Sequence, residues 1–188
     1  LSKKREATTL DRNAQFLPYV HIDSPFVVYS GSFDPFHEGH AAVIQKLAEK
    51  TRKPVYLELS VRNVDKPDVD LSGLADRMRS IYMGIMKYSL KTIAGVILTN
   101  MPKFFDKLSL LGPKASFVVG SDTASRMVDN KYGNVESLFD LIEVYGTEIF
   151  VCDRPGYNFA APKQYEQRFT FLPGTGLQIS STELRNKV

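Results

Sequence analysis

Short apolar runs alternate with longer segments of helical periodicity along most of this chain. The apolar runs are predicted strands at residues 25–29, 54–59, 93–98, 115–119, 149–152 and 169–172. The segments with apolar side chains at helical spacing cover residues 39–50, 74–85 and 135–145. Such alternation is typical of an α/β protein with a parallel sheet and right-handed crossovers. We therefore expect a doubly wound sheet in which the loops after the first and fourth strands lie together at the ligand crevice.

Length and composition favour one soluble domain. The 188 residues suffice for one substantial core, and 43% apolar with 24% charged residues is close to the globular average. We expect an N-terminal extension over residues 1–24 and a single domain over residues 25–188. No apolar run approaches the roughly 18–20 residues of a membrane span, and the basic residues 3–5 precede no apolar signal core. A cytoplasmic location is expected, with the nucleus as the alternative.

Charge and cysteine content bear on the partners of the chain. The net charge of +3 owes much to residues 3–5, and no basic stripe with interleaved aromatic residues follows, as a nucleic-acid groove would require. We expect no nucleic-acid or membrane partner, and the modest positive charge suits phosphorylated small molecules. The single cysteine, Cys152, lies in an apolar run and indicates a buried strand thiol rather than a nucleophile. The sequence leaves open whether the chain forms a homo-oligomer.

The first predicted strand leads directly into the segment Gly31-Ser32-Phe33-Asp34-Pro35-Phe36-His37-Glu38-Gly39-His40, where a helix begins. A Gly/Ser turn at a strand end leaves backbone N–H groups for a phosphate, and the helix N-terminus adds a favourable dipole. His37 and His40 are three residues apart, a spacing that can place both imidazoles on one face. Gly39 allows a ligand to approach the backbone closely. The segment therefore predicts an anion site.

Other interpretations of these histidines stay open. A His pair can arise by chance, can cap a helix, or can bind a metal at this spacing. The third histidine, His21, lies in a stretch without a motif and receives no role.

A second motif near the end of the chain is Ile179-Ser180-Ser181-Thr182-Glu183-Leu184-Arg185, after the flexible residues 173–176. Taken alone, Ser followed by Glu is an ordinary helix N-cap pattern. Together with the first motif, it gains a functional interpretation.

The segments GSFDPFHEGH and ISSTELR, in this order and at this wide separation, resemble the nucleotidylyltransferase superfamily. The resemblance covers nearly all of residues 26–187 and points toward the branch of nicotinamide mononucleotide adenylyltransferases. It implies a single Rossmann-like domain. The implied residue roles fall into two groups. A nucleotide-binding group comprises Gly31, Ser32, Phe33, Gly39, Ile179, Ser180, Ser181 and Thr182, and a catalytic group comprises His37, His40 and Arg185.

Three further positions are similar to family positions, with less specific motifs. Gly120 and Asp122 follow the fourth strand, where adenylyltransferases carry a Gly-x-Asp turn against the nucleotide; a plain helix N-cap is the alternative. Lys66 lies in the loop after the second strand, where many members place a lysine that reaches the reacting phosphates; a solvated loop charge is the alternative. On topology alone, Arg154 is a candidate for the same crevice edge.

The reaction implied by the resemblance is the transfer of AMP from ATP to nicotinamide or nicotinate mononucleotide, with release of pyrophosphate. Mg²⁺ would accompany ATP and be held largely by the substrate, so no protein metal ligands are predicted. Members that act on pyridine nucleotides usually stack the acceptor ring on aromatic residues that include Trp. This chain has no Trp, so Phe104, Phe105 or Tyr132 would have to replace it.

Two alternative functions remain at this stage. One is a cytidylyltransferase that uses CTP and a phospho-alcohol. The other is a nucleotide-binding module that has lost turnover, although the intact histidines and the Ser-Ser-Thr segment argue against it.

Overall fold

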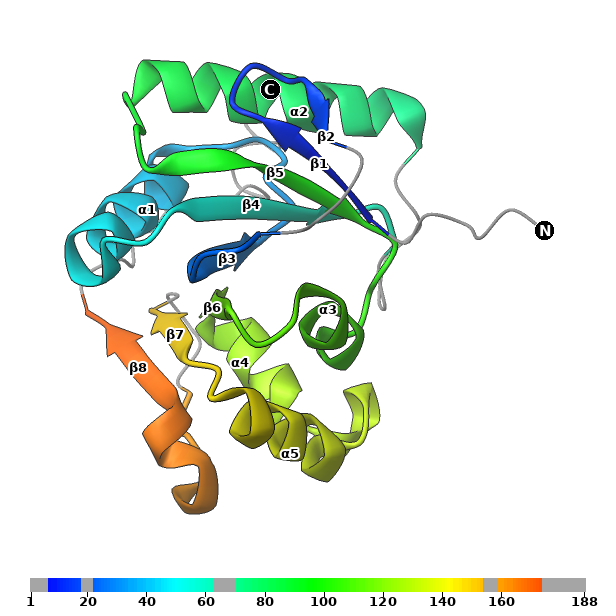
Figure 1. Ribbon diagram of the computed structural model, residues 1–188, viewed down its shortest axis with the longest axis vertical. Helices are drawn as coiled ribbons and strands as arrows, with labels where there is room; N and C mark the ends of the chain where they lie inside the picture. Colours follow the sequence, from blue (N-terminus) through cyan, green and yellow to red (C-terminus); the bar gives the residue numbers. More distant parts are fainter. Residues whose placement is uncertain (1–6, 18–21, 63–69, 154–158, 174–188) are drawn as a thin grey trace.

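One eight-stranded sheet forms the centre of the molecule (Figure 1). The computed structural model describes residues 7–17, 22–62, 70–153 and 159–173. The strands are β1 (Ala7–Asp11), β2 (Phe16–Leu17), β3 (Phe26–Ser30), β4 (Val55–Ser60), β5 (Ile93–Thr99), β6 (Ala115–Gly120), β7 (Ile149–Cys152) and β8 (Phe169–Leu172). Their order across the sheet is β2-β1-β5-β4-β3-β6-β7-β8.

The strands from β3 to β8 form a parallel block. Within it, the order β5-β4-β3-β6-β7-β8 is that of the Rossmann fold, 3-2-1-4-5-6. The predicted Rossmann-like fold is therefore confirmed, and each of the six predicted strands forms at or within one residue of its expected ends.

Helices cover both faces of the sheet (Figure 1). The helices are α1 (Glu38–Thr51), α2 (Leu71–Lys87), α3 (Phe104–Leu111), α4 (Ser121–Met127) and α5 (Val135–Tyr145), with short 3-10 helices η1 (Asn130–Tyr132) and η2 (Lys163–Arg168). One face carries α1 and α2, and the other carries α3, α4 and α5. The sheet is thus covered by a helical layer on each side, as a mainly parallel sheet requires.

The central strand β3 shows why this sequence forms a strand buried on both sides. Val27 and Tyr29 pack into the core beneath α1 and α2, whereas Phe26 and Val28 pack into the core against α3 and α5. Neighbouring side chains in a strand point to opposite faces. Since helices cover both faces of the sheet, all four side chains are buried. The resulting run is continuously apolar rather than alternating.

Strand β1 lies inside residues 1–24, the segment expected to be an N-terminal extension. Residues 7–11 pair antiparallel with β5, and β2 pairs with β1. Thr9 and Leu10 are buried, and the hydroxyl of Tyr82 in α2 donates to the carbonyl oxygen of Asp11 at 2.9 Å. The sheet therefore extends across the boundary expected between residues 24 and 25. Among the described helices, none has the length and hydropathy needed to cross a membrane.

Candidate active site

The sheet topology brings two of the predicted site segments together. Strands β3 and β6 are hydrogen-bonded parallel neighbours, with Tyr29 opposite Val118. The segment Gly31–His40 follows β3 and the turn at Gly120 follows β6, so both leave the same edge at the point where the strand order reverses. That point is where open α/β sheets bind ligands. The expectation that the loops after the first and fourth predicted strands lie together is confirmed.

His37 and His40 form a reciprocal cap at the start of α1. Nδ1 of His37 accepts the backbone N–H of Gly39, and the backbone N–H of His37 donates to Nδ1 of His40, both at 3.1 Å. The two ring centroids are 3.8 Å apart. Since Nδ1 is the acceptor in both rings, a neutral imidazole carries its proton on Nε2. Both rings therefore belong to one unit at the positive end of the helix dipole, where an anion is stabilised.

An aromatic cluster holds the His40 ring. Its centroid lies 5.0 Å from that of Phe33, 5.2 Å from Phe36 and 5.9 Å from Tyr29. Phe33 is fully buried and Phe36 nearly so. Packing against large apolar rings limits the orientations open to the imidazole, whereas its predicted contact with a phosphate stays a prediction.

The backbone at Phe33 takes a left-handed conformation that few residues with a side chain adopt, with φ of 44°. This conformation costs about 1–2 kcal/mol in an L-residue. It turns the ring back over Gly31, where an added Cβ would lie 2.9 Å from the ring. Burial of the Phe33 ring offsets the strain, and Gly31 is needed for that close approach. The predicted nucleotide contacts of Gly31, Ser32 and Phe33 stay predictions.

The turn after β6 lies next to the segment that follows β3, because the two strands are neighbours in the sheet. Gly120 is the N-cap of α4, and Asp122 lies in its first turn. A Cβ at Gly120 would come within 2.7 Å of Oδ1 of Asp122, so the carboxylate lies directly over the Gly120 backbone. Cys152 pairs with Gly120 in the sheet, is buried, and donates its thiol to the carbonyl oxygen of Val119 at 3.3 Å. The inference of a buried strand thiol is confirmed.

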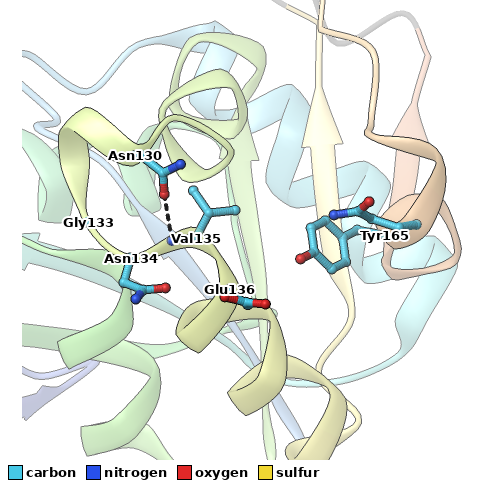
Figure 2. A pocket seen from close by; sticks show the side chains of 7 residues that line it. Asn130, Gly133, Asn134, Val135, Glu136 and Tyr165 are labelled. Carbon is cyan, nitrogen blue, oxygen red and sulfur yellow. Dashed lines mark hydrogen bonds between the residues drawn. The ribbon is translucent and has the colours of Figure 1, made fainter.

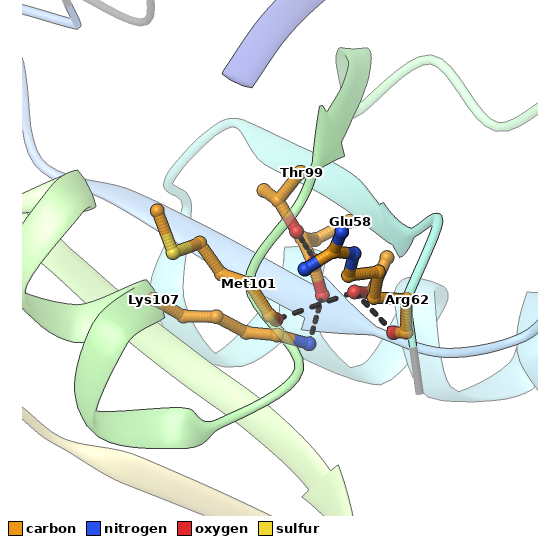
Figure 3. A network of polar contacts seen from close by, with 6 residues as sticks. Glu58, Arg62, Thr99, Met101 and Lys107 are labelled. Atoms are coloured by element: carbon orange, nitrogen blue, oxygen red, sulfur yellow. Dashed lines mark hydrogen bonds and ion pairs between the residues drawn. The ribbon is translucent and has the colours of Figure 1, made fainter. Parts of the chain in front are cut away.

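Sequence reasoning missed a buried polar network at the carboxyl ends of β4 and β5 (Figure 3). Glu58 is fully buried in β4, and Nζ of Lys107 in α3 lies 2.7 Å from its Oε2. The hydroxyl of Thr99 donates to the other carboxylate oxygen. The hydroxyl of Ser60 reaches the carbonyl oxygens of Arg62 and Met101. One available signal was the single Glu within an otherwise apolar strand, since a buried charge requires a partner.

A second group of contacts that sequence reasoning missed joins α2 to the Gly31–His40 segment. The hydroxyl of Ser80 accepts the backbone N–H of Phe36 at 2.8 Å, and Arg77 pairs with Asp34 at 3.3 Å. Gly84 lies under the Phe36 ring. The signal in the sequence was Gly84 itself, because a glycine inside a helical pattern often marks a close approach.

Several predicted positions lie outside the described residues. They are Lys66, Arg154, Ile179, Ser180, Ser181, Thr182 and Arg185, together with His21. Their predicted roles therefore stay predictions. Gly39 is described: it is buried in the first turn of α1.

The three aromatic candidates for an acceptor platform differ in environment. The Phe104 ring is partly buried and packs against the core, with its centroid 4.7 Å from that of Phe117. Phe105 is 41% exposed on the outside of α3. Tyr132 is half-buried in η1, with Arg126 and Lys131 within about 5.5 Å of its ring centroid. Of the three, only Tyr132 offers a partly accessible ring beside cationic groups.

A polar pocket of about 550 Å³ lies between the start of α5 and η2 (Figure 2). The lining residues are Asn130, Gly133, Asn134, Val135, Glu136, Gln164 and Tyr165. The amide oxygen of Asn130 accepts the backbone N–H of Val135 at 3.3 Å, and the Tyr165 ring stacks on Phe139. None of the lining side chains is cationic, so the pocket does not offer the charge that a triphosphate requires.

A model of the cytidylyltransferase-like family matches residues 28–187, from β3 through the second motif. The chain belongs to that family. No curated protein matches the chain significantly. Membership of the cytidylyltransferase-like family supports a nucleotidyltransferase in general, which acts on a nucleotide and a phosphorylated acceptor, and confirms the resemblance at the level of the superfamily.

Within the described residues, no group of three or more His, Cys, Asp or Glu side chains could hold a metal ion. The acidic groups of the two site loops are Asp34, which pairs with Arg77, the exposed Glu38, and Asp122.

Proposed function

We propose that the chain transfers AMP from ATP to nicotinamide or nicotinate mononucleotide and releases pyrophosphate. The observation that carries the proposal is the His37–His40 unit. Both imidazoles are held through Nδ1 at the N-terminus of α1, beside the turn that contains Gly120 and Asp122. Neutral rings held in this way carry their protons on Nε2, so the unit would offer two N–H donors beside the positive end of the α1 dipole. Those groups match the charge that develops on a phosphate in nucleotidyl transfer.

The proposed chemistry is an in-line displacement at the α-phosphorus of ATP. A phosphate oxygen of the acceptor forms a bond to this phosphorus, and the bond to the oxygen that bridges to the β-phosphate breaks. The electron pair leaves with pyrophosphate, and no covalent enzyme intermediate forms. The Nε2–H groups of His37 and His40 would donate to phosphate oxygens as negative charge builds up, so their contribution is positioning and electrostatic stabilisation.

The second motif has enough chain to reach this position. Nζ of Lys46 in α1 contacts the carbonyl oxygen of Pro173, the last described residue. Nine residues of helix between His37 and Lys46 rise about 14 Å, whereas seven extended residues from Pro173 to Ser180 span up to about 23 Å. This supports the proposal that Ser180, Ser181, Thr182 and Arg185 hold the β- and γ-phosphates, with Lys66 reaching the reacting phosphates.

Mg²⁺ would enter this reaction as part of the ATP substrate. Mg²⁺ commonly binds through substrate phosphates and only one or two carboxylates. The lack of a metal-binding cluster in the described part of the chain is compatible with that mode. The metal would neutralise phosphate charge while the histidines act on the oxygens around the α-phosphorus.

A cytidylyltransferase that uses CTP and a phospho-alcohol is the second candidate. The specific observation in its favour is the family match itself, which is described as cytidylyltransferase-like. The histidine unit serves either nucleotide equally well, because it would act on phosphates rather than on the base.

The test is pyrophosphate release by the purified chain with ATP or CTP, across pyridine mononucleotide and phospho-alcohol acceptors in Mg²⁺. We expect release with ATP and a pyridine mononucleotide, and its loss when EDTA removes the metal. Release only with CTP would assign the second candidate. Nucleotide binding without release for any pair would contradict both and favour a module without turnover.

A further inference from the structure

One face of α2 contacts the Gly31–His40 segment at three points. The contacting residues are Arg77, Ser80 and Gly84, whose spacings of three and four place them on one face of the helix. They touch Asp34 and Phe36, which precede the histidines and lie more than 40 residues away in sequence. A helix separate from α1 thus supports the loop that leads into the histidine unit.

The contact from Ser80 fixes the backbone of the loop. Its hydroxyl oxygen accepts the N–H of Phe36 at 2.8 Å, in a partly buried position. Phe36 directly precedes the cap residue His37, so this bond sets the direction in which the chain enters α1. Serine is not a strong helix former, so propensity alone does not explain Ser80 in the middle of α2. Its hydroxyl instead has a defined partner outside the helix.

The contact from Gly84 fixes the side chain of the same residue. A Cβ built on Gly84 would lie 2.2 Å from Cδ1 of Phe36 and 2.8 Å from Cε1. The ring therefore rests on the helix backbone itself, an approach that only glycine permits. Glycine weakens a helix interior, so Gly84 costs some stability in the middle of α2. The close approach of the Phe36 ring explains why a glycine is needed there.

The Phe36 ring packs directly on the His40 imidazole, and its backbone leads into His37. The Phe36 and His40 ring centroids are 5.2 Å apart, and Nδ1 of His40 accepts the backbone N–H of His37. A displacement of the Phe36 ring or backbone must therefore alter the packing of His40 and the entry of His37 into the helix. Interiors packed at crystal-like density transmit such shifts.

We propose that Ser80 and Gly84 are positioning residues that set the orientation of His37 and His40 through Phe36. They act through another residue and are assigned no contact with a substrate. The orientation itself is a property of the fold, whereas its use in nucleotidyl transfer rests on the function proposed above. Two measurements therefore test the orientation of the histidines and its use in the reaction separately.

The first readout is the NMR signals of the histidine Cε1–H groups in the full chain without nucleotide. The chain has three histidines, so His37→Gln and His40→Gln assign the signals. Ser80→Ala and Gly84→Ala should shift the His37 and His40 signals. Ser80→Thr, which keeps a hydroxyl, should restore them toward the wild-type positions.

Two exposed positions supply matched controls. Ser109→Ala removes an exposed serine from α3, and Met86→Ala changes a side chain of α2 that is 80% exposed. Both should leave the His37 and His40 signals at their wild-type positions. If Gly84→Ala does not fold, the comparison of Ser80→Ala with Ser80→Thr tests the inference instead. Ser80→Ala removes the hydroxyl and adds no atoms, so it introduces no clash.

The second readout is steady-state kinetics with the nucleotide and acceptor identified by pyrophosphate release. Misplacement of the imidazoles should lower kcat about tenfold to a hundredfold in Ser80→Ala and Gly84→Ala, while the Kd for ATP changes much less. Unshifted histidine signals in folded Ser80→Ala and Gly84→Ala would overturn the positioning inference. Shifted signals in a chain that releases no pyrophosphate would uphold it and contradict only the proposed reaction.

Discussion

The two ring nitrogens of His37 and His40 have separate roles: Nδ1 takes part in the cap of α1, and we propose that Nε2 contacts the substrate. Nδ1 of His37 and of His40 accepts a backbone N–H at the start of α1. Nε2 is the nitrogen that carries the proton in a neutral ring. Protonation of Nδ1 would turn the acceptor into a donor and break the cap. In the proposed reaction, helix capping and phosphate contact would therefore depend on different atoms of one side chain.

Substitution of His40 by Asn or Gln should separate these uses. Asn can place an oxygen near the position of Nδ1 and keep the cap bond, whereas Gln can place an N–H near Nε2. We expect His40→Asn to retain about 1 kcal/mol more stability than His40→Ala but to lose pyrophosphate release by about 10²-fold or more. His40→Gln should keep more activity than His40→Asn. Urea denaturation and the release assay measure the two effects, and equal activity of both variants would argue against a role for Nε2.

At the scale of secondary-structure elements, the ion pair of Lys107 with Glu58 joins α3 to β4, and the Thr99 hydroxyl links the same carboxylate to β5 (Figure 3). Glu58 is fully buried and the Lys107 side chain is only 12% exposed. Removal of one partner would leave a charge in a poorly solvated position, which costs more than the pair itself contributes.

A mutant cycle on this pair should be strongly non-additive. Lys107→Met leaves the Glu58 carboxylate without its cation and should lower the free energy of unfolding by about 3–5 kcal/mol. The double variant Glu58→Gln/Lys107→Met removes both charges and should be more stable than Lys107→Met alone. Urea denaturation at neutral pH measures all four proteins. Losses that simply add would contradict the buried-pair interpretation.

Tyr82 connects two other elements, α2 and β1, through its hydrogen bond to the carbonyl oxygen of Asp11. Burial, and then the negative charge of Asp11, raise the pKa of Tyr82 above the ordinary value of 10.0. The protonated phenol is thus favoured in the folded state. Its contribution to stability is complete below pH 10 and is lost as the pH rises through the raised pKa.

Tyr82→Phe should therefore cost about 1 kcal/mol of unfolding free energy at pH 8 and less above pH 10. The difference between wild type and variant isolates this group from other residues that titrate at alkaline pH, such as Tyr56, whose pKa burial also raises. Denaturant titrations at pH 8 and at about pH 10.5 provide the comparison. A difference that stays constant, or grows, over this interval would be inconsistent with the raised pKa.

At the scale of the whole molecule, the strand order places the site and the N-terminal strands in different regions. The histidine loop leaves β3 at the centre of the sheet, whereas β1 and β2 lie beyond β5 at one edge. Stability at that edge depends on buried Thr9 and Leu10 and on pairing between β1 and β5.

Deletion of residues 1–22 should lower stability while leaving the histidine unit in place. Loss of the buried Leu10 side chain alone removes about 2 kcal/mol of hydrophobic stabilisation, and β5 becomes an edge strand. Thermal unfolding should show a lower Tm, and the His37 and His40 NMR signals should stay near their wild-type positions. An unchanged Tm would contradict a structural role for this segment.

Local patterns predicted the parallel part of the fold well. The first strand was expected at residues 25–29 and forms at Phe26–Ser30, and the helix expected at 39–50 forms at Glu38–Thr51. The spacing of apolar residues within each segment indicates which of its side chains become buried. Strand β1 was not predicted, because its burial depends on pairing with β5, more than 80 residues later.

The sequence by itself predicted the order of the six parallel strands and of three helices, the loop that carries both histidines, and the resemblance to the superfamily, because each depends on short segments or motifs that are recognisable locally. Only the tertiary structure decided what surrounds that loop. The bond from Phe36 to Ser80 joins residues 44 apart, and the bond from Lys107 to Glu58 joins residues 49 apart. Such pairs leave no periodic signal, since each is specified by the packing of whole helices on the sheet rather than by the conformation of a single segment.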